Sequence, residues 1–326
     1  MIDLAVARIV VTGGAGFLGQ AVTRVLRARG VPAERIVVPR RREFDLTVEA
    51  DVARLYESAR PDVLIHLAAE VGGIGANMAH PGRFFYANMA MGLHLVEYAR
   101  RHGIRKFVHT GTVCAYPKFC PVPFREDDLW NGYPEETNAP YGVAKKAIFV
   151  MLDGYRREYG LASAVAVPVN LYGPGDNFDP ASSHVIPALI RKCEEARLAD
   201  APEVICWGTG AATREFLYVD DAAEGIVRAA EVMEEPLPIN LGGGREIAIR
   251  DLVGKVAAAC GYTGRIAWDT TKPDGQPRRS LDISRARDLL GWEPRQNFDA
   301  GLAATVAWWR AHGGRAAATV PAAPAR

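Results

Sequence analysis

Over the first 112 residues, short apolar runs rich in β-branched side chains alternate with longer stretches in which apolar residues recur at helical spacing. The short runs are typical of strands buried on both faces of a sheet, and they lie at Ile9–Thr12, Arg35–Pro39, Asp62–Leu67 and Lys106–Thr112. The stretches between them predict helices at Gly19–Arg29, Val48–Ala59 and Pro81–His102. This alternation predicts a parallel sheet with helices on both of its faces.

Two further elements extend the pattern. A helix is predicted at Tyr141–Tyr159, and an apolar strand follows it at Ser163–Val169. Together with the earlier elements they predict an α/β, doubly wound Rossmann domain that binds a dinucleotide and spans residues 1–170.

After residue 170 the regular alternation stops. A stretch rich in Gly, Pro, Asp and Asn at 171–183 is typical of a loop, and short helices and strands follow it without strict order. We expect residues 171–312 to form mainly a smaller, discontinuous α/β substrate-binding lobe, with residues 215–245 returning to the sheet. The stretch 313–326 has small side chains and prolines, and it is predicted to be a disordered tail.

Composition and charge narrow the class of protein. The 326 residues carry 39 Lys and Arg against 38 Asp and Glu, a net charge of +1, which argues against a broadly basic nucleic-acid-binding surface. No apolar run approaches the ~20 residues that a membrane span needs, and residues 1–8 show no secretory signal. Five cysteines without a CxxC pair favour neither a disulfide framework nor a zinc ribbon. We therefore expect a cytoplasmic protein with reduced thiols, no membrane or nucleic-acid partner and no bound metal.

A glycine-rich turn joins the first predicted strand to the first predicted helix. Gly13, Gly16 and Gly19 have the spacing GxxGxxG, which allows a tight turn and a close approach of the backbone to a pyrophosphate. The helix that begins there offers free N–H groups and the positive end of its dipole. A glycine-rich turn without a ligand is the alternative. Its place in the first strand–helix unit favours a dinucleotide site that includes Phe17 and Leu18.

The residues after the second predicted strand indicate which dinucleotide is bound. NAD-binding proteins usually carry Asp or Glu there for the ribose hydroxyls, whereas this chain has Arg40-Arg41-Arg42. Guanidinium groups suit the 2′-phosphate of NADP, so Arg40 favours NADP, with NAD as the alternative cofactor. Asp45 and Leu46 follow, where the carboxylate of Asp45 could bond the adenine amino group. The other interpretation is that the three arginines form a solvated turn.

A tyrosine and a lysine at Tyr141 and Lys145 lie on one face of the same predicted helix, because they are four residues apart. A nearby ammonium and a cationic nicotinamide would lower the pKa of the phenol. Such a tyrosine can pass a proton to a carbonyl oxygen while hydride arrives at the carbon. Thr112 ends the fourth predicted strand at the carboxyl edge of the sheet, where doubly wound folds bind their ligands. A surface pair on a helix is the alternative interpretation of the tyrosine and lysine.

Longer strings of sequence resemble the GDP-L-fucose synthase family, in the nucleotide-sugar branch of the extended short-chain dehydrogenases/reductases. The first group is His66-Leu67-Ala68-Ala69, Val71-Gly72-Gly73-Ile74, Cys114-Ala115-Tyr116-Pro117-Lys118 and Thr137-Asn138-Ala139-Pro140-Tyr141. The second group is Asn170-Leu171-Tyr172-Gly173-Pro174, Asp176-Asn177-Phe178, Ser182-Ser183-His184-Val185-Ile186-Pro187-Ala188-Leu189, Arg214-Glu215-Phe216-Leu217 and Lys272-Pro273-Asp274-Gly275. The resemblance covers about residues 8–310.

The resemblance implies a reaction and a set of roles. The family converts GDP-4-keto-6-deoxy-D-mannose to GDP-L-fucose by epimerising C3 and C5 and then reducing C4 with NADPH, and its members commonly form homodimers. The catalytic residues implied here are Tyr141, Lys145, Thr112 in place of a serine, and, for proton transfer during epimerisation, Cys114 and His184. Further cofactor contacts are expected at Leu67, Ala68, Ala69, Pro168, Asn170 and Leu171. Contacts with the nucleotide-diphosphate sugar are expected at Asn170, His184, Val185, Arg191, Lys192, Trp207, Arg214 and Lys272.

The chemistry is consistent with these residue types. A C4 ketone acidifies the hydrogens on C3 and C5, and inversion needs a base on one face and an acid on the other, for which a thiol and an imidazole are suitable partners. Each of these two groups also has a purely structural interpretation. Cys114 could be a small buried hydrophobe at a strand end, and His184 could simply begin a helix.

Two departures from the family keep other activities open. The glycine loop is closer to that of general sugar epimerases, and Val113 is apolar where the family tends to have a small polar residue. The alternatives are an epimerase-only or reductase-only enzyme acting on another nucleotide sugar, such as a GDP-heptose or a dTDP- or UDP-sugar. A dinucleotide-sensing protein without catalysis is disfavoured, because such proteins tend to lose the Tyr–Lys pair.

Overall fold

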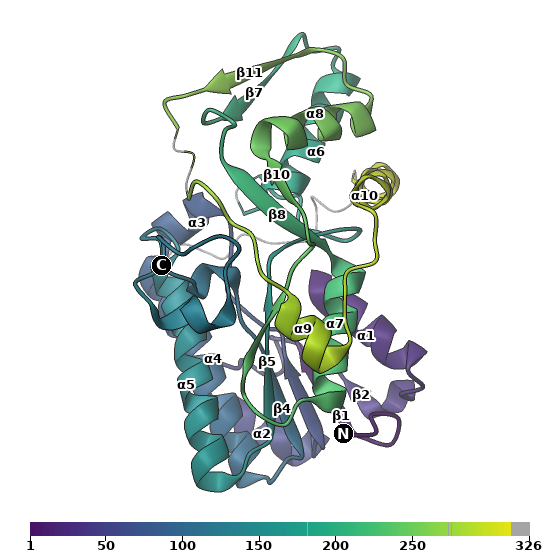
Figure 1. The fold of residues 1–326 in the computed structure, drawn as a ribbon. Helices are drawn as coiled ribbons and strands as arrows, with labels where there is room; N and C mark the ends of the chain where they lie inside the picture. The colour runs from purple at the N-terminus through teal and green to yellow at the C-terminus, as the bar shows by residue number, and fades with distance from the viewer. Residues whose placement is uncertain (181, 273, 275, 314–326) are drawn as a thin grey trace.

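Six parallel strands form the sheet of the lower lobe in Figure 1, in the order β2-β1-β3-β4-β5-β9. In chain order they are β1 (Ile9–Thr12), β2 (Ile36–Val37), β3 (Val63–His66), β4 (Lys106–Thr110), β5 (Ser163–Pro168) and β9 (Pro238–Leu241). This computed structural model describes residues 1–180, 182–272, 274 and 276–313. Every residue of β1, β3, β4 and β5 is buried, which explains why apolar side chains predominate in β1, β3 and β5. The predicted doubly wound fold is confirmed.

Helices cover both faces of this sheet. They are α1 (Phe17–Ala28), α2 (Glu49–Ala59), α4 (Pro81–Arg101), α5 (Ala139–Tyr159) and α7 (Val219–Val232). Helix α1 packs against α7, and α4 packs against α2 and α5, so the two groups form separate layers (Figure 1). The buried side chains of α1 fall on one face of the helix: Ala21, Val22, Val25 and Leu26.

The order of the strands creates the place where a ligand binds. β2 pairs with one side of β1 and β3 with the other, so the chain reverses direction across the sheet at β1. In doubly wound sheets such a reversal opens a crevice at the carboxyl ends of the two strands. Thr12 and His66 end β1 and β3 at this edge.

The chain leaves this sheet after β5 and later returns to it. Strand β9 pairs in parallel with β5, and α7 packs against β5 and β4. A short helix, α9 (Ser284–Leu290), lies against α7 and β9. The two lobes are therefore connected by several crossings of the chain (Figure 1).

The upper lobe contains two small sheets and its own apolar core. One sheet has the order β10-β8-β6, from β6 (Asn170–Tyr172), β8 (Thr213–Tyr218) and β10 (Glu246–Ala248), and the other pairs β7 (Glu203–Trp207) with β11 (Arg265–Asp269). The helices of this lobe are α6 (Val185–Leu198), α8 (Ile249–Cys260) and α10 (Phe298–His312). Buried side chains from all three helices form the core together with Phe178 and Phe216.

Several predicted elements differ from the structure. The strand expected at Arg35–Pro39 has only two residues, because β2 is a partly exposed edge strand of the sheet. A short helix, α3 (Ile74–Ala79), and the parallel pair β7–β11 were not predicted. The expected disordered tail at 313–326 lies outside the described residues except for Gly313.

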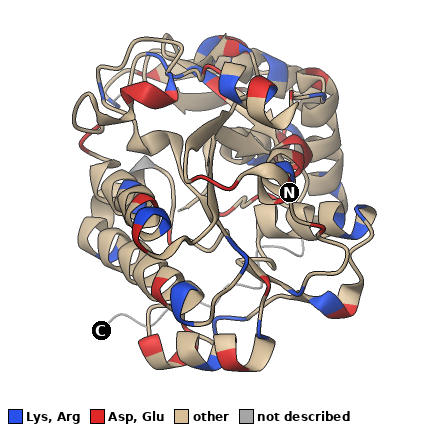
Figure 2. Cartoon of the chain, turned by 60° about the horizontal axis from the view of Figure 1, so that its bottom comes forward, with Lys and Arg blue, Asp and Glu red and all other residues tan. Residues whose placement is uncertain are grey.

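Residues of both charges are interspersed along the chain drawn in Figure 2. No helix in the described part of the chain is long and apolar enough to cross a membrane. Among the same residues, no group of three or more His, Cys, Asp and Glu side chains is arranged to hold a metal ion.

Candidate functional site

The glycine loop after β1 is closed too tightly to accept side chains at its key positions. Gly13 has a φ of +71°, and a Cβ added at Gly19 would lie 2.1 Å from the carbonyl oxygen of Gly13. Gly16 is the N-cap of α1, which has no side-chain cap and no acidic residue in its first turn. The first N–H groups of α1 are therefore free of side-chain caps and suited to the pyrophosphate of a dinucleotide.

The loop after β3 lies directly beside the glycine loop. A Cβ on Gly13 would lie 2.8 Å from the backbone nitrogen of Ala68, and this nitrogen is 3.4 Å from the hydroxyl of Thr12. Leu67 donates its N–H to the carbonyl oxygen of Thr12, and Ala69 follows in the same loop. The structure thus brings Leu67, Ala68 and Ala69 to the crevice at which the glycine loop opens.

The arginine cluster contains one free cation. Arg41 pairs with Glu70 at 3.0 Å and Arg42 with Glu43 at 3.4 Å, whereas the described residues place no carboxylate within ion-pair distance of Arg40. The exposed guanidinium of Arg40 is therefore available to a 2′-phosphate.

Asp45 is engaged within its own turn. Its carboxylate accepts hydrogen bonds from the N–H and hydroxyl of Thr47, at 3.0 and 2.7 Å. Burial alone would raise the pKa of Asp45, but these hydrogen bonds and the charge of Arg41 outweigh it and lower the pKa. The side chain of Leu46 is buried in the main core and anchors this turn to it.

Tyr141, Thr112 and Cys114 meet where α5 packs against the turn that follows β4. Thr112 accepts a hydrogen bond from the backbone N–H of Cys114 at 3.2 Å, and its hydroxyl is close enough to the phenol of Tyr141 to lower the pKa of that phenol. Gly142 makes this packing possible, because a Cβ there would lie 2.2 Å from the carbonyl oxygen of Cys114. Lys145 follows one turn further along α5 and is buried.

The protonation of the Tyr–Lys pair differs from the sequence prediction. Burial raises the pKa of Tyr141, the negative charge of a Cys114 thiolate raises it further, and the Thr112 hydrogen bond lowers it only in part. Burial also lowers the pKa of Lys145 to about 7. The predicted lowering of the phenol pKa by the ammonium is therefore wrong for the protein itself. A phenol of high pKa keeps its proton at neutral pH and can donate it.

Two histidines near Lys145 were not recognised from the sequence. His66 and His109 are fully buried neighbours whose ring centroids are 5.5 Å apart, and the hydroxyl of Thr12 bonds Nδ1 of His66 at 2.8 Å. Burial and the charge of Lys145 lower the pKa of both rings, so both are neutral. Their signal in the sequence was weak, because His66 is the last residue of β3 and His109 lies among other buried residues of β4.

His184 begins α6 and faces the same region from the upper lobe. Its ring is accessible to solvent but surrounded by protein, and this surrounding protein and the charge of Arg279 lower its pKa. The backbone near it contacts the lower lobe, since Gly73 donates its N–H to the carbonyl oxygen of Ser182 at 3.3 Å. Val185 is the first residue of the helix and is half-buried.

Arg279 was missed by the sequence analysis. Its Nη1 lies 3.9 Å from the sulfur of Cys114, and its charge also lowers the pKa values of His184 and Arg214. Arg214 donates to the backbone oxygens of Thr213 and Asp274, and its pKa is lowered to about 10, first by burial. Two guanidinium groups thus lie near the thiol.

The predicted substrate residues of the upper lobe fall into two groups. The ammonium of Lys272 lies 5.5 Å from the ring centroid of Trp207, whose side chain is 62% exposed and able to stack on a base. The other two cations have protein partners, because Arg191 pairs with Glu195 at 2.7 Å and Lys192 donates to the carbonyl oxygen of Ile205.

The residues after β5 link the two lobes. Pro168 is buried at the end of β5, and Asn170 donates its amide N–H to the carbonyl oxygen of Glu215 at 3.0 Å. Leu171 packs against the main core. Asn170 therefore joins β6 to β8, and the half-buried part of its side chain faces the border between the lobes.

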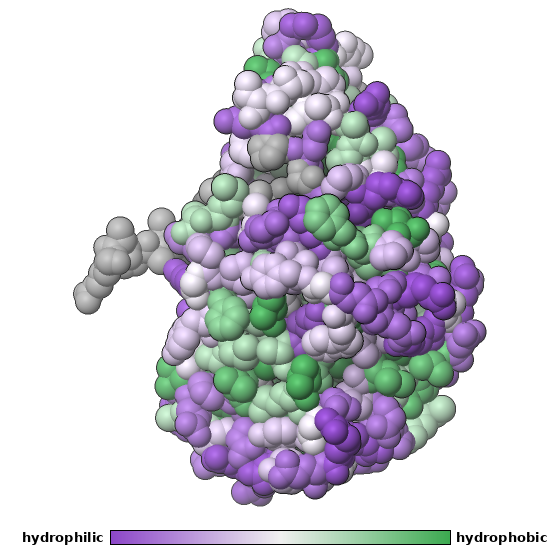
Figure 3. Space-filling view, turned by 60° about the vertical axis from the view of Figure 1, so that its left-hand side comes forward, coloured by the Kyte–Doolittle hydropathy of each residue, from purple (hydrophilic) through white to green (hydrophobic). Residues whose placement is uncertain are grey.

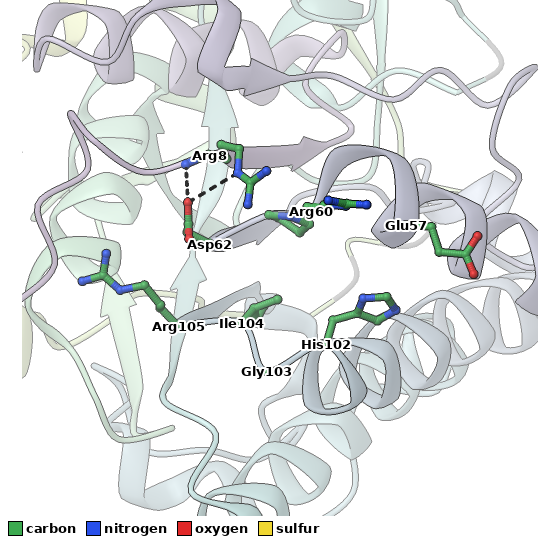
Figure 4. A pocket seen from close by; sticks show the side chains of 9 residues that line it. Arg8, Glu57, Arg60, Asp62, His102, Gly103, Ile104 and Arg105 are labelled. Carbon is green, nitrogen blue, oxygen red and sulfur yellow. Dashed lines mark hydrogen bonds and ion pairs between the residues drawn. The ribbon is translucent and has the colours of Figure 1, made fainter.

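A cavity of about 430 Å³ lies at the opposite edge of the sheet (Figure 4). Its lining includes Arg8, Asp62 and Arg105, which precede β1, β3 and β4. Arg8 and Asp62 form an ion pair at 3.8 Å across it. This cavity contains none of the predicted site residues, which follow the carboxyl ends of the strands.

Comparisons with known proteins identify relatives of this arrangement. A sequence model described as the NAD dependent epimerase/dehydratase family matches residues 9–242. The chain is 39% identical to GDP-L-fucose synthase 1 of Arabidopsis thaliana over 303 residues, which cover 93% of each chain.

Solved structures share the whole fold. A GDP-6-OMe-4-keto-L-xylo-heptose reductase from C. jejuni aligns with a TM-score of 0.87 and 26% identity, over 93% of this chain and 97% of that one. A GDP-L-fucose synthetase from Naegleria fowleri bound to NADP aligns with a TM-score of 0.83 and 25% identity, over 94% and 95% of the two chains.

Proposed function

The chain belongs to the NAD dependent epimerase/dehydratase family, and we propose that it converts GDP-4-keto-6-deoxy-D-mannose to GDP-L-fucose as an NADPH-dependent 3,5-epimerase and 4-reductase. Similarity to a GDP-L-fucose synthase over 93% of both chains supports this activity. The observation that carries the proposal is the meeting of a phenol, a hydroxyl and a thiol from Tyr141, Thr112 and Cys114 beside the crevice of a dinucleotide-binding sheet.

NADPH is the cofactor of this reaction and, when bound, supplies the hydride for C4. The tight glycine loop and the free N–H groups of α1 suit its pyrophosphate. Arg40 suits the 2′-phosphate because it lacks a carboxylate partner among the described residues, and Lys145 is the candidate for the nicotinamide ribose. The NADP bound to the related Naegleria fowleri structure supports the same cofactor.

The substrate is a nucleotide-diphosphate sugar that lies between the lobes. We assign its diphosphate to Arg214, because a half-buried guanidinium close to a second cation, Arg279, gains from an anion. The exposed ring of Trp207, with the ammonium of Lys272 over it, offers a stacking surface for the base. Arg191 and Lys192 already have protein partners, so we expect smaller contributions from them.

Epimerisation requires proton transfer on both faces of the sugar. Cys114 and His184 are the two groups that we assign to it, one removing the proton next to the ketone and the other returning a proton on the opposite face. The lowered pKa of His184 keeps its ring neutral near pH 7, so the ring takes up a proton before it returns one to the sugar. The hydroxyls of Tyr141 and Thr112 are donors that can stabilise the enolate oxygen.

Reduction uses the same oxygen. Tyr141 donates its phenolic proton to O4 as the carbon becomes tetrahedral, which suits a phenol whose pKa is raised by burial. Thr112 lies beside the phenol and offsets part of this rise in its pKa. One site can therefore perform both steps in succession.

The test is incubation of the purified protein and NADPH with a panel of GDP-, dTDP- and UDP-linked 4-keto-6-deoxy sugars, with the products identified by NMR. We expect GDP-L-fucose from the GDP-mannose derivative and slow or no turnover of the other nucleotides. Cys114→Ser should slow epimerisation more than reduction. Equal loss of both steps with the fold intact would contradict the role of the thiol.

A reductase-only enzyme acting on a GDP-heptose is the second candidate. The alignment with a GDP-heptose reductase at a TM-score of 0.87 favours it. The same panel separates the two, because a reductase-only enzyme returns a 4-hydroxy product whose C3 and C5 keep the configuration of the substrate. GDP-4-keto heptoses belong in the panel for this reason.

We also propose that the protein is a homodimer. Apolar side chains gather on the lower half of the face in Figure 3, on the side that α4 and α5 occupy in Figure 1. Exposed apolar residues on these two helices include Phe85, Leu93 and Val150, with exposures of 38%, 42% and 54%. Sedimentation of the wild type and of Val150→Glu tests this proposal, and a monomeric wild type would contradict it.

A further inference from the structure

Arg279 is a buried cation whose counter-charge is missing from the described part of the chain. Its residue is 9% exposed, its Nε donates to the side-chain oxygen of Gln276 at 3.1 Å, and no carboxylate there lies within ion-pair distance. The adjacent Arg278 behaves differently, because it is exposed and pairs with Glu246. Burying a guanidinium without a carboxylate partner costs free energy, so the group that Arg279 contacts is expected to offset part of this cost.

That contact is the thiol of Cys114. Nη1 of Arg279 points to the sulfur at 3.9 Å, within the range of a hydrogen bond to sulfur. The contact joins residues that are 165 positions apart in the chain.

The segment that carries Arg279 is fixed on both sides. Gln276 donates to the carbonyl oxygen of Lys118 at 2.9 Å, and the N–H of Leu281 donates to the carboxylate of Glu215 at 2.6 Å. Glu215 is fully buried, and it also accepts from Gly244 at 2.7 Å. The guanidinium is therefore held against the sulfur by the backbone around it.

The other groups that face Cys114 leave its surroundings positive. Thr112 accepts from the backbone N–H of Cys114, and Tyr141 on α5 is a neutral phenol at neutral pH because its pKa is raised. Arg214 on β8 is the remaining charged neighbour, and it is a second cation. Beyond them, His184 at the start of α6 is neutral near pH 7, since its pKa is lowered, and Asp274 and Glu135 are acidic groups that act on Arg214.

We propose that Arg279 is the positioning residue for Cys114 and stabilises the negative charge that its sulfur carries when it acts as the base of the epimerisation. The thiol releases its proton to solvent, and the guanidinium donates a hydrogen bond to the sulfur and stabilises its negative charge. The thiolate then takes the proton from the carbon next to the ketone. The electron pair of that C–H bond passes to the ketone oxygen, and the cysteine becomes a thiol. The catalytic part of this inference rests on the proposed function.

The first test needs no sugar. Alkylation of Cys114 by iodoacetamide is followed against pH, with peptide mass spectrometry separating Cys114 from the partly buried Cys120. Arg279→Gln and Arg279→Met should slow alkylation about tenfold at pH 7 and move the half-maximal rate to higher pH, because each removes an opposite charge near the sulfur. Arg279→Lys should restore much of the rate, and the control Arg278→Gln should match the wild type. Unchanged pH profiles in the folded neutral variants would overturn the inference.

The second test connects the thiolate to the reaction. In D₂O, the neutral variants should exchange the C3 and C5 hydrogens of the 4-keto sugar about tenfold more slowly at pH 7 and recover at high pH. Circular dichroism and NADPH binding establish that each variant is folded. If Arg279→Gln is not folded, Arg279→Met replaces it as the neutral variant. If the wild type exchanges neither hydrogen while the alkylation profiles still shift, the proposed function fails and the role of Arg279 in forming the thiolate stands.

Discussion

Gly142→Ala tests the packing that joins Tyr141 to Cys114. The added Cβ would lie 2.2 Å from the carbonyl oxygen of Cys114, below the 3.0 Å that real Cβ atoms keep. The first turn of α5 and the turn after β4 must therefore separate by about 0.8 Å or more. The three atoms nearest to this Cβ, the carbonyl oxygen and carbon of Cys114 and the nitrogen of Ala115, all belong to the backbone, so no flexible side chain can move aside.

This displacement should affect the chemistry more than the fold. A shift of about 1 Å between reacting groups can cost on the order of 100-fold in rate. Overpacking typically costs about 1–3 kcal/mol of stability, against a gain of up to about 1 kcal/mol from replacing glycine in a helix. We expect kcat for NADPH oxidation with the 4-keto sugar to fall about 100-fold, with NADPH affinity within about threefold of the wild type.

Gly154→Ala is the matched control on the same helix. A Cβ at Gly154 meets nothing within 4 Å, so the substitution should leave kcat unchanged and raise the free energy of unfolding by up to about 1 kcal/mol. The assays are NADPH oxidation followed by absorbance, NADPH binding followed by fluorescence, and unfolding in urea. If Gly142→Ala keeps kcat within about threefold of the wild type, the contact between α5 and the Cys114 turn does not position the catalytic groups.

Three further changes test other parts of the site. Tyr141→Phe should reduce NADPH oxidation by about 100-fold or more by removing the proton donor, and a near-normal rate would exclude it from that role. Arg40→Ala should raise the KM for NADPH but not for NADH, whereas Arg42→Ala, which removes an arginine paired with Glu43, should change neither. Asp176 is buried with one carboxylate oxygen unpartnered among the described residues, and burial raises its pKa to about 7. The free energy of unfolding of the wild type should therefore fall as pH rises from 4 through 7. Urea unfolding at pH 5 and pH 8 should show this fall in the wild type but not in Asp176→Asn.

The central sheet was predictable because burial on both faces leaves a strong pattern. Strands β1, β3, β4 and β5 are buried at every residue, and apolar side chains predominate in β1, β3 and β5. The pair β7–β11 was not predicted, because both strands are partly exposed and lie about 60 residues apart in the chain. In β7 the alternation of Glu203–Trp207 was the only local signal, and five residues of alternation are weak.

The parts of the site that lie within a short motif were predictable from the sequence. Contacts between residues that are distant in the chain were not. The glycine loop and the Tyr–Lys spacing are local, and the structure places each where its motif suggests. Arg279 and Cys114 are 165 residues apart in the chain, so no local sequence motif indicates their contact. The pKa values of Tyr141 and Lys145 also depend on burial. Burial raises the pKa of the phenol, whereas the sequence predicted that it would be lowered.

The most direct test of the account follows isotopes through one turnover of GDP-4-keto-6-deoxy-D-mannose. With NADPH in D₂O, the account predicts GDP-L-fucose with deuterium at C3 and C5 and none at C4. With NADPH deuterated at the transferred position in H₂O, it predicts deuterium at C4 alone. A reduced product without solvent deuterium at C3 and C5 would contradict the double activity, and a product without cofactor deuterium at C4 would contradict the reduction.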